Sequence, residues 1–290
     1  MRIAGFLFIR NAIKYNYPVE ASIRSLLPLC DEVIVSVGKS EDDTEGLIRS
    51  IHSPKIKIHH TVWDDTLLKG GRVLAVETDK AFDQVSADID WCIYLQGDEV
   101  IHEDDYPVIR RSMEQYKDNP QVEGLLFKYR HFYGSYDYIG DSRRWYSHEI
   151  RVIRNDRSIR SYRDAQGFRK DGRKLQVKPI DAYIYHYGWV RHPMHQLQKH
   201  LDFEKLYDSD RLAKDISTKQ TQEFDYSSID SLVQFTGTHP TPMLSIIEKQ
   251  NWHFSTDISK KNFTLKTWLL YWVERYTGHR LFDYRNYKII

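Results

Sequence analysis

The first 116 residues alternate short apolar runs with stretches in which apolar residues recur at helical spacing. The runs have the length and the β-branched or aromatic make-up of buried strands, and they cover 3–9, 32–37, 56–62 and 91–95. The helical stretches cover 20–29, 44–51, 73–85 and 106–116. Strands that alternate with helices predict an α/β domain whose central sheet is mostly parallel and flanked by helices.

The pattern changes in the second half of the chain. Residues 124–129 and 147–153 are further predicted strands, whereas the aromatic, glycine-punctuated stretch 130–144 is predicted as a loop. Helical spacing returns from residue 191, 224–235 is polar and loop-like, and Pro242 is well placed to begin a helix. We predict one domain over 1–190 and a helical C-terminal extension over 191–290 that packs on it.

Composition is that of an ordinary globular enzyme. Hydrophobic residues make up 41% of the 290, enough for a sizeable core, and 42 Lys and Arg stand against 41 Asp and Glu. This balance gives no reason to expect a nucleic-acid partner. The two cysteines, Cys30 and Cys92, lie in apolar runs and are predicted to be reduced core residues rather than disulfide or zinc ligands.

The sequence offers two hypotheses about membranes. No stretch approaches the ~18 apolar residues of a membrane span, and the N-terminus lacks a signal-peptide pattern, so we expect a cytoplasmic protein. The end of the chain gathers Trp268, Leu269 and Trp272 between Lys and Arg residues. This segment is predicted either to pack back on the domain or to form an interfacial helix at the inner face of the plasma membrane.

Candidate chemistry concentrates in DWCIYLQGDEVIHEDD, residues 90–105. Gln96 and Gly97 end the apolar run, and Asp98 and Glu99 follow where the strand would end. Ligands of open α/β sheets bind beyond the carboxyl ends of the strands. Two carboxylates there could hold a divalent cation that bridges to a diphosphate, or they could simply be acidic residues at a helix N-terminus.

Nucleotide-binding fingerprints of other classes are missing. No G-x-G-x-x-G and no Walker loop follows any of the predicted strands. A dinucleotide-binding or P-loop hypothesis therefore lacks its motif.

Four segments, in sequence order, resemble the nucleotide-sugar half of family 2 glycosyltransferases with the GT-A fold, which is Rossmann-like. They are Arg10-Asn11 after the first strand, DEVIVSVGKSEDDTEGLI, Trp63 with Lys69-Gly70-Gly71, and DWCIYLQGDEVI. The resemblance implies a nucleotide-sugar half over 1–130 and an acceptor half over 131–190. It also implies a nucleotide-sugar site formed by Arg10, Asn11, Ser36, Trp63, Lys69, Arg72, Gln96, Gly97 and Asp98.

The same resemblance implies a divalent cation, Mn or Mg, held by Asp98 with Glu99 in support. Two departures from the family pattern bear on the donor. Gln96 replaces the first Asp of the family's D-x-D, so it can donate a hydrogen bond but adds no charge. Ser36 and Val37 occupy the place of the acidic residue that often binds uracil in the family. The sequence therefore does not decide between a UDP-sugar and a GDP-sugar as donor.

The stretch from WYSHEIRVIRND to KPIDAYIYHYGW resembles the acceptor half of the family. The match implies that Asp164 is the catalytic base and that His186 is a further metal or diphosphate contact. Glu149 is a competing candidate for the base. The alternatives are a loop carboxylate that pairs with Arg163 or Arg169, and a His186 that is merely buried.

A local basic excess lies between residues 143 and 178, where twelve Lys and Arg stand against four Asp and Glu. It is either a solvated surface or a basic rim that neutralises a diphosphate or attracts an anionic acceptor. Aromatic residues interleave with these charges, as in sugar-binding sites, but single-stranded nucleic acid uses a similar mixture.

The sequence as a whole predicts an inverting, metal-dependent glycosyltransferase that moves a sugar from a UDP- or GDP-sugar to a glycan or lipid-linked glycan acceptor. One alternative is a non-catalytic protein that binds nucleotide or glycan in a degenerate site, which Gln96 motivates. Another is a nucleotidyltransferase, although its usual Gly-rich basic loop is replaced here by Arg10-Asn11-Ala12-Ile13.

Overall fold

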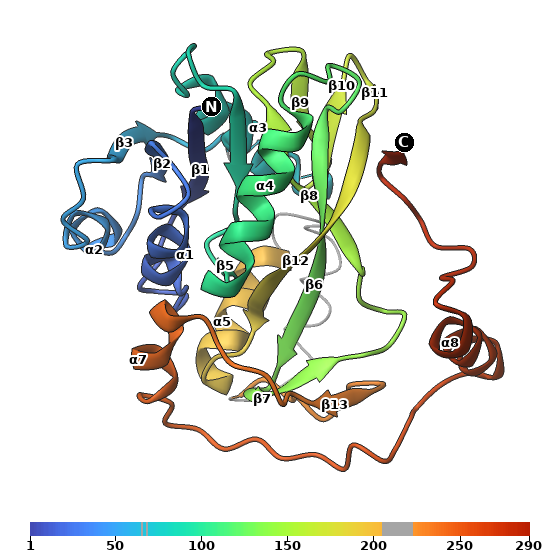
Figure 1. Ribbon diagram of the computed structural model, residues 1–290. Coiled ribbons are helices and arrows are strands. Elements are labelled where there is room, and N and C mark those ends of the chain that lie inside the picture. The colour runs from blue at the N-terminus through green and yellow to red at the C-terminus, as the bar shows by residue number, and fades with distance from the viewer. Residues whose placement is uncertain (65, 68, 205–222) are drawn as a thin grey trace.

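The computed structural model describes residues 1–64, 66–67, 69–204 and 223–290. Its first half contains the predicted elements in the predicted order (Figure 1). The strands are β1 (Ile3–Ile9), β2 (Glu32–Gly38), β3 (Ile56–Thr61) and β4 (Trp91–Tyr94). The helices are α1 (Val19–Leu26), α2 (Thr44–Arg49), α3 (Arg72–Asp83) and α4 (Tyr106–Tyr116).

These four strands are parallel, in the order β4-β1-β2-β3. The sheet continues past β4 through β8 (His148–Arg154), which is antiparallel to it, then β6 (Gly124–Tyr133) and β7 (Ser135–Gly140). The long β12 (Gln176–Trp189) pairs with β6 in parallel and with the short β5 (Glu99–Ile101) antiparallel. The predicted α/β class, with a mostly parallel central sheet flanked by helices, is confirmed.

Two loop predictions were wrong. Strand β6 continues to Tyr133, and β7 follows after Gly134, whose φ of +74° suits the tight turn. The aromatic residues of this stretch are core residues, because Phe132 stacks on Tyr187 of β12 with ring centroids 4.7 Å apart. Within the predicted polar loop 224–235, a short strand, β13 (Leu232–Gln234), pairs with β7.

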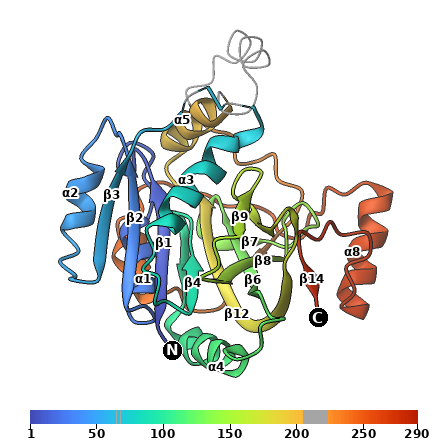
Figure 2. The same ribbon diagram turned by 90° about the horizontal axis from the view of Figure 1, so that it is seen from above.

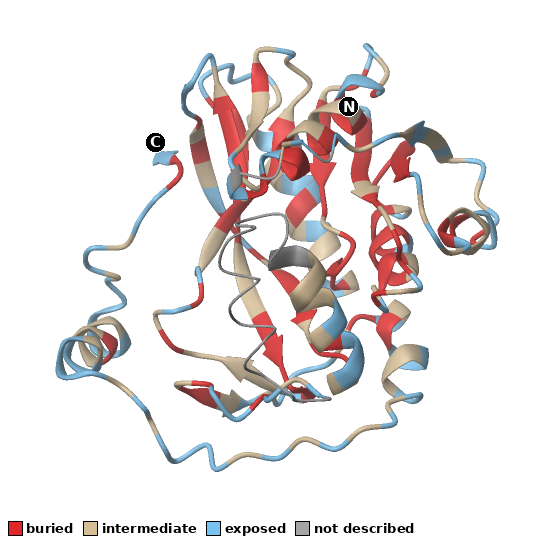
Figure 3. Cartoon of the chain, turned by 180° about the vertical axis from the view of Figure 1, so that it is seen from behind, coloured by how far each residue is buried: buried red, intermediate tan, exposed pale blue. Residues whose placement is uncertain are grey.

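The sheet is buried on both faces, as Figure 3 shows for its central strands. Alternate residues of β1 enter different clusters: Leu7 and Ile9 pack with α1 and α4, whereas Ala4 and Phe6 pack with α3. Helix α3 therefore covers the face opposite to α1 and α4, an arrangement that Figure 2 shows from above.

A small antiparallel sheet lies against α3. It consists of β9 (Ile159–Tyr162), β10 (Gly167–Lys170) and β11 (Arg173–Lys174). The backbone N–H of Ser161 in β9 donates to Oδ1 of Asp79 in α3 at 2.8 Å. This contact fixes the β9–β10 turn, which contains Asp164, over the first turns of α3.

The described part of residues 191–290 combines helices with irregular segments, and it returns two short strands to the sheet, β13 and β14 (Lys288–Ile289). Its helical elements are α5 (Pro193–Glu204), the 3-10 turn η3 (Thr241–Met243), α7 (Leu244–Ile247) and α8 (Leu265–Thr277). Figure 1 shows α8 at the margin of the molecule, joined to the rest by long connections. Within the described residues, every helix is too short or too polar to span a lipid bilayer.

A buried ion pair joins the two parts of the sheet. Arg151 of β8 donates to Glu99 of β5 through Nε at 2.8 Å and through Nη2 at 2.7 Å, and both side chains are almost fully buried. The hydroxyl of Tyr129 and the backbone N–H of Gln96 also donate to Glu99. Four donors therefore satisfy this carboxylate, and they hold the β4–β5 turn in place.

We predict that Arg151→Met destabilises the protein by about 3–5 kcal/mol, because it leaves the Glu99 charge buried without its ionic partner. Denaturant unfolding at pH 7 measures the change. Arg160→Gln is the matched control, since Arg160 pairs with Asp83 at the exposed surface and its loss should cost less than about 1 kcal/mol. Equal losses in the two variants would contradict a structural role for the buried pair.

Candidate functional site

The carboxyl ends of β1 and β2 form one side of the candidate site. Arg10, directly after β1, places its guanidinium 4.7 Å from the ring centroid of Trp63. Gly38 ends β2, and a Cβ there would lie 2.4 Å from Nε1 of Trp63, so only glycine permits this approach. The structure thus brings together Arg10 and Trp63, two residues of the predicted nucleotide-sugar set.

Two other residues of that set, Asn11 and Ser36, are buried in the fold. Asn11 has a left-handed φ of 56°, and its Oδ1 accepts from the backbone N–H of Glu41 at 2.7 Å. It therefore ties the turn after β1 to the loop after β2. Ser36 is fully buried inside β2, two residues before the strand ends.

Arg72 and Asp164 line one cavity of about 650 Å³ between the start of α3 and the β9–β10 turn. Arg163 and Ala165, on either side of Asp164, have left-handed φ values of 57° and 62°. Asp79 lines the same cavity, and burial raises the pKa of its carboxyl to about 6. The side chain of Lys69, also predicted here, lies outside the described part of the chain.

Asp98 lies in the turn between β4 and β5, with its side chain 8% exposed. Its Oδ2 accepts a hydrogen bond from Lys199 Nζ of α5 at 3.1 Å and lies 4.0 Å from Arg191 Nη2. Its Oδ1 lies 3.8 Å from His186 Nε2 of β12. Burial acts to raise the pKa of Asp98, but Lys199, His186 and Arg191 together hold it below its ordinary value.

A chain of hydrogen bonds fixes the proton on His186. The carbonyl oxygen of Tyr146 can only accept, so His131 donates to it through Nε2, at 2.8 Å. Burial lowers the pKa of both histidines and keeps them neutral at pH 7. Neutral His131 must then accept at Nδ1 from Nδ1–H of His186, at 3.0 Å. His186 Nε2 is left with a lone pair on the side of Asp98.

The three predicted cation ligands therefore separate into two groups. Asp98 and His186 lie together, whereas Glu99 is engaged by Arg151. Among the described residues, no group of three or more His, Cys, Asp or Glu could hold a metal ion. Asp98 and His186 alone still offer an oxygen and a nitrogen ligand, which suffices where substrate phosphates and water complete the coordination.

Glu149, the competing candidate for the base, is buried near Glu99 and Asp164. Burial, followed by the charge of Glu99, raises the pKa of Glu149 to about 8, although Arg151 acts in the opposite direction. Its Oε2 has no hydrogen-bond partner within the described residues. At pH 7 this carboxyl is mostly protonated, and a protonated carboxyl cannot accept a proton as a general base.

The basic stretch 143–178 is largely engaged inside the fold. Eight of its twelve basic residues form hydrogen bonds or ion pairs with other parts of the protein: Arg143, Arg151, Arg154, Arg157, Arg160, Arg169, Lys170 and Arg173. The hypothesis of a continuous basic rim is therefore weakened.

The sequence did not point to Arg191 and Lys199, which lie beside Asp98, or to His131, which contacts His186. His131 was included in a predicted loop, and Lys199 is one of several cations on a helix with a mixed pattern. Only their place in the tertiary structure singles them out.

No protein-family model matches the sequence, and no curated protein matches it. Among solved structures, the chain is similar to residues 1–349 of TarS from S. aureus, with a TM-score of 0.42 and 13% identity, over 76% of this chain and 67% of that one. A second structure of TarS 1–349, in complex with UDP, gives a TM-score of 0.40 at 12% identity.

The chain is also similar to glucosyl-3-phosphoglycerate synthase from Mycobacterium tuberculosis in complex with Mn²⁺ and UDP-glucose. That TM-score is 0.31 at 20% identity, over 44% of each chain. A third likeness is to 4-diphosphocytidyl-2C-methyl-D-erythritol synthase from Anaerococcus prevotii, with a TM-score of 0.35 at 11% identity, over 53% of this chain and 71% of that one. These likenesses are distant, and the function of this chain must be argued from its own residues.

Proposed function

We propose that the protein is a glycosyltransferase that moves a sugar from a nucleotide-sugar donor to a glycan or lipid-linked glycan acceptor. The observation that carries the proposal is the grouping around Asp98, where one carboxylate, one imidazole lone pair and two cations meet just beyond β4. A departing nucleoside diphosphate needs such a combination, because its negative charge grows as the sugar leaves.

Asp98 and His186 fit a divalent cation, Mn or Mg, because they supply a carboxylate oxygen and an imidazole lone pair that His131 orients. When bound, such a cation offsets the charge of the leaving diphosphate. Asp98 and His186 would hold it, while Glu99 supports the site only indirectly through its bonds to Arg151 and to the backbone of Gln96.

The donor would lie along the carboxyl ends of β1, β2 and β4. The Arg10 guanidinium stacks on the ring of Trp63 there. Gln96 lies at the end of β4 and is partly exposed. We propose a UDP- or GDP-sugar as donor, with Arg10, Trp63 and Gln96 near the nucleoside.

The acceptor would enter the cavity that Arg72 and Asp164 line. Inverting transfer requires a carboxylate that removes the proton of the attacking hydroxyl while the sugar leaves from the opposite face. We assign this role to Asp164, because Glu149 is held protonated by its burial.

A second candidate function is nucleotide or glycan binding without turnover. The observation in its favour is Gln96, which removes one of the two carboxylates that the family motif provides. Incubation with a donor sugar separates the two functions, because only an enzyme releases free nucleoside diphosphate.

We predict that UDP or GDP raises the melting temperature of the wild-type protein and that Mn²⁺ increases this shift, since ligands that bind only the native state stabilise it by mass action. Asp98→Asn and His186→Gln should lose the Mn²⁺-dependent part of the shift, and Asp98→Ala should abolish transfer. Differential scanning fluorimetry with UDP-, GDP-, CMP- and dTDP-sugars, with and without Mn²⁺, measures the effect. A nucleotide panel without any shift would refute the proposed donor class.

We predict that Asp164→Asn lowers kcat by about 10²–10⁴-fold, the usual effect of losing a general base, while the donor dissociation constant stays unchanged. Single-turnover transfer with the donor found in the panel measures kcat. Glu149→Gln should retain most of the wild-type rate, because it replaces a carboxyl that is already neutral. The reverse result would assign the base to Glu149.

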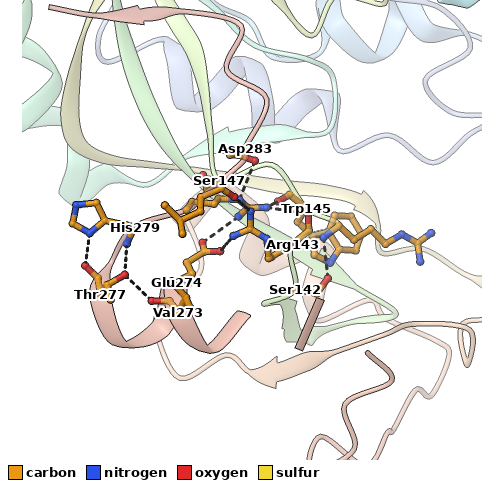
Figure 4. A network of polar contacts seen from close by, with 12 residues as sticks. Ser142, Arg143, Trp145, Ser147, Val273, Glu274, Thr277, His279 and Asp283 are labelled. Carbon is orange, nitrogen blue, oxygen red and sulfur yellow. Dashed lines mark hydrogen bonds and ion pairs between the residues drawn. The ribbon is translucent and has the colours of Figure 1, made fainter. Parts of the chain in front are cut away.

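The C-terminal helix supports a further part of the proposal, a peripheral contact with the inner face of the plasma membrane. One side of α8 is fixed to the protein: Arg143 pairs with Glu274 at 2.7 Å (Figure 4), and Tyr271 donates to Asp141 at 2.7 Å. Large apolar side chains on and after the helix are exposed, namely Leu265, Trp268, Leu269, Tyr276 and Phe282. Such a face beside Lys and Arg suits an anionic lipid surface.

We predict that the protein sediments with vesicles of phosphatidylglycerol and not with vesicles of phosphatidylcholine alone. The double variant Trp268→Ser/Leu269→Ser should lose about a hundredfold or more in vesicle affinity, because each buried apolar side chain contributes roughly 1.5–3 kcal/mol. Ile13→Ser, at an exposed apolar position far along the chain, is the matched control. Sedimentation that is equal for the double variant and the wild type would exclude α8 as the contact.

A further inference from the structure

Cations and tyrosines alternate in a row across the small antiparallel sheet and the segment that follows α8. The order is Arg169, Tyr162, Arg163, Tyr284 and Lys174, and we call these five residues the cation–tyrosine row. Each cation lies over a neighbouring ring of the row, at 4.3, 5.2, 5.5 and 5.7 Å from the ring centroids in that order. Strands β9, β10 and β11 and the segment after α8 all contribute, so only the fold brings these residues together.

The segment that contains Tyr284 is fixed to the small sheet. Nη1 of Arg169 donates to the carbonyl oxygen of Asn286 at 2.8 Å, and Asn286 is buried. A Cβ at Gly167 of β10 would lie 2.3 Å from Nδ2 of Asn286, so this close packing requires glycine. Two residues later the chain enters β14, which pairs with β12 (Figure 1). The position of Tyr284 beside the small sheet is therefore set by packing and by backbone pairing.

The outer part of the row is exposed, and its cations lack carboxylate partners. Arg163 and Lys174 are exposed, and Tyr284 is 57% exposed. Neither Arg163 nor Lys174 forms an ion pair with a carboxylate of the described residues, whereas Lys170 and Arg173 in the same sheet both pair with Glu123. Two positive charges and an aromatic ring thus face solvent together.

The row continues into the cavity that we assign to the acceptor. Arg163 lines this cavity together with Arg72, and it directly precedes Asp164. Its backbone has a left-handed φ of 57°, a conformation that arginine adopts at a cost in free energy. A ligand whose end occupies the cavity would therefore have the rest of its length beside Arg163 and Tyr284.

We propose that the cation–tyrosine row binds the chain of an anionic glycan acceptor whose reacting end enters the cavity. The proposal rests on the proposed function and names the chemical class of the acceptor, a glycan with repeated carboxylate or phosphate groups. A guanidinium can donate two parallel hydrogen bonds to either anion, and an ammonium adds a point charge. Tyrosine rings are flat, amphipathic surfaces that suit the apolar face of a sugar ring.

Single-stranded nucleic acid is the competing partner, because it also binds to aromatic rings among cations. Two observations favour the glycan. The row leads to the cavity proposed for a sugar acceptor. The chain as a whole carries 42 Lys and Arg against 41 Asp and Glu, which gives no general attraction for a nucleic-acid backbone.

Fluorescence anisotropy with labelled oligogalacturonate tests the row without donor, metal or turnover. The wild type should bind it at least about tenfold more tightly than the methyl-esterified form, which has the same sugars without the charges. Phosphomannan oligosaccharides and neutral mannan form a second pair of probes, and the tighter of the two anionic probes identifies the preferred anion. Equal binding of charged and neutral forms in both pairs would overturn the proposal. So would tighter binding of oligothymidylate than of either anionic glycan.

Charge variants connect this binding to the row. Arg163→Gln and Lys174→Met should each weaken binding by about two- to fivefold, the effect of one exposed ion pair, and the double variant by about tenfold. The controls Arg49→Gln and Lys128→Met, whose cations already pair with carboxylates, should bind as the wild type does. All these side chains lie at the surface, so the melting temperatures should stay at the wild-type value. Wild-type binding by the double variant would overturn the proposal.

An aromatic variant tests the contribution of the tyrosine. Tyr284→Ala should weaken binding by about fivefold, because it removes the ring that lies between the two exposed cations. Tyr276→Ala, at an exposed tyrosine of α8, is the matched control and should bind as the wild type does. Equal dissociation constants for the two variants would exclude Tyr284 from the surface.

Acceptor kinetics distinguish failure of this proposal from failure of the proposed function. In Lys174→Met/Tyr284→Ala, which leaves the residues that line the cavity in place, KM for the anionic acceptor should rise by about tenfold while kcat and the donor KM stay unchanged. An active transferase whose double variant keeps the wild-type acceptor KM would lose the row. A protein that binds the anionic glycan through the row but never releases nucleoside diphosphate from a donor sugar would keep the row and lose the transferase activity.

Discussion

The pair between Glu99 and Arg151 is the interaction on which the rest of the site depends. Strand β4 belongs to the parallel half of the sheet, and β5, immediately after it, pairs antiparallel with β12. The chain must therefore turn sharply over Gln96-Gly97-Asp98. Glu99, the next residue, stabilises this turn, because its carboxylate accepts hydrogen bonds from Arg151 of β8 and from the backbone N–H of Gln96.

This arrangement gives two adjacent carboxylates opposite tasks. Neighbouring residues of an extended chain direct their side chains to opposite sides. Glu99 accordingly enters the interior and meets a full set of donors, whereas Asp98 faces His186, Lys199 and Arg191. The sequence motif alone could not predict which carboxylate is buried, because an Asp-Glu pair after a strand reads the same whichever side chain points inward.

Local patterning predicted the parallel half of the fold, since its strands and helices have apolar periods that tertiary contacts reinforce. Local patterning failed for residues 130–144. His131 and Phe132 resemble residues of an aromatic loop in the sequence, but they lie in β6, which pairs with β12. The pairing of Asp98 with His186 followed from the resemblance to a family. Arg191 and Lys199 could not be predicted in the same way, because only the folded structure brings the residue after β12 and the side chain from α5 next to Asp98.

The two carboxylate oxygens of Asp98 have different surroundings. His131 accepts a hydrogen bond from Nδ1–H of His186, so Nε2 of His186 offers a lone pair rather than a positive charge on the Oδ1 side of Asp98. Lys199 and Arg191 lie on the Oδ2 side. One oxygen of the carboxylate thus faces a neutral imidazole, and the other faces two fixed cations, so the charge around Asp98 is uneven.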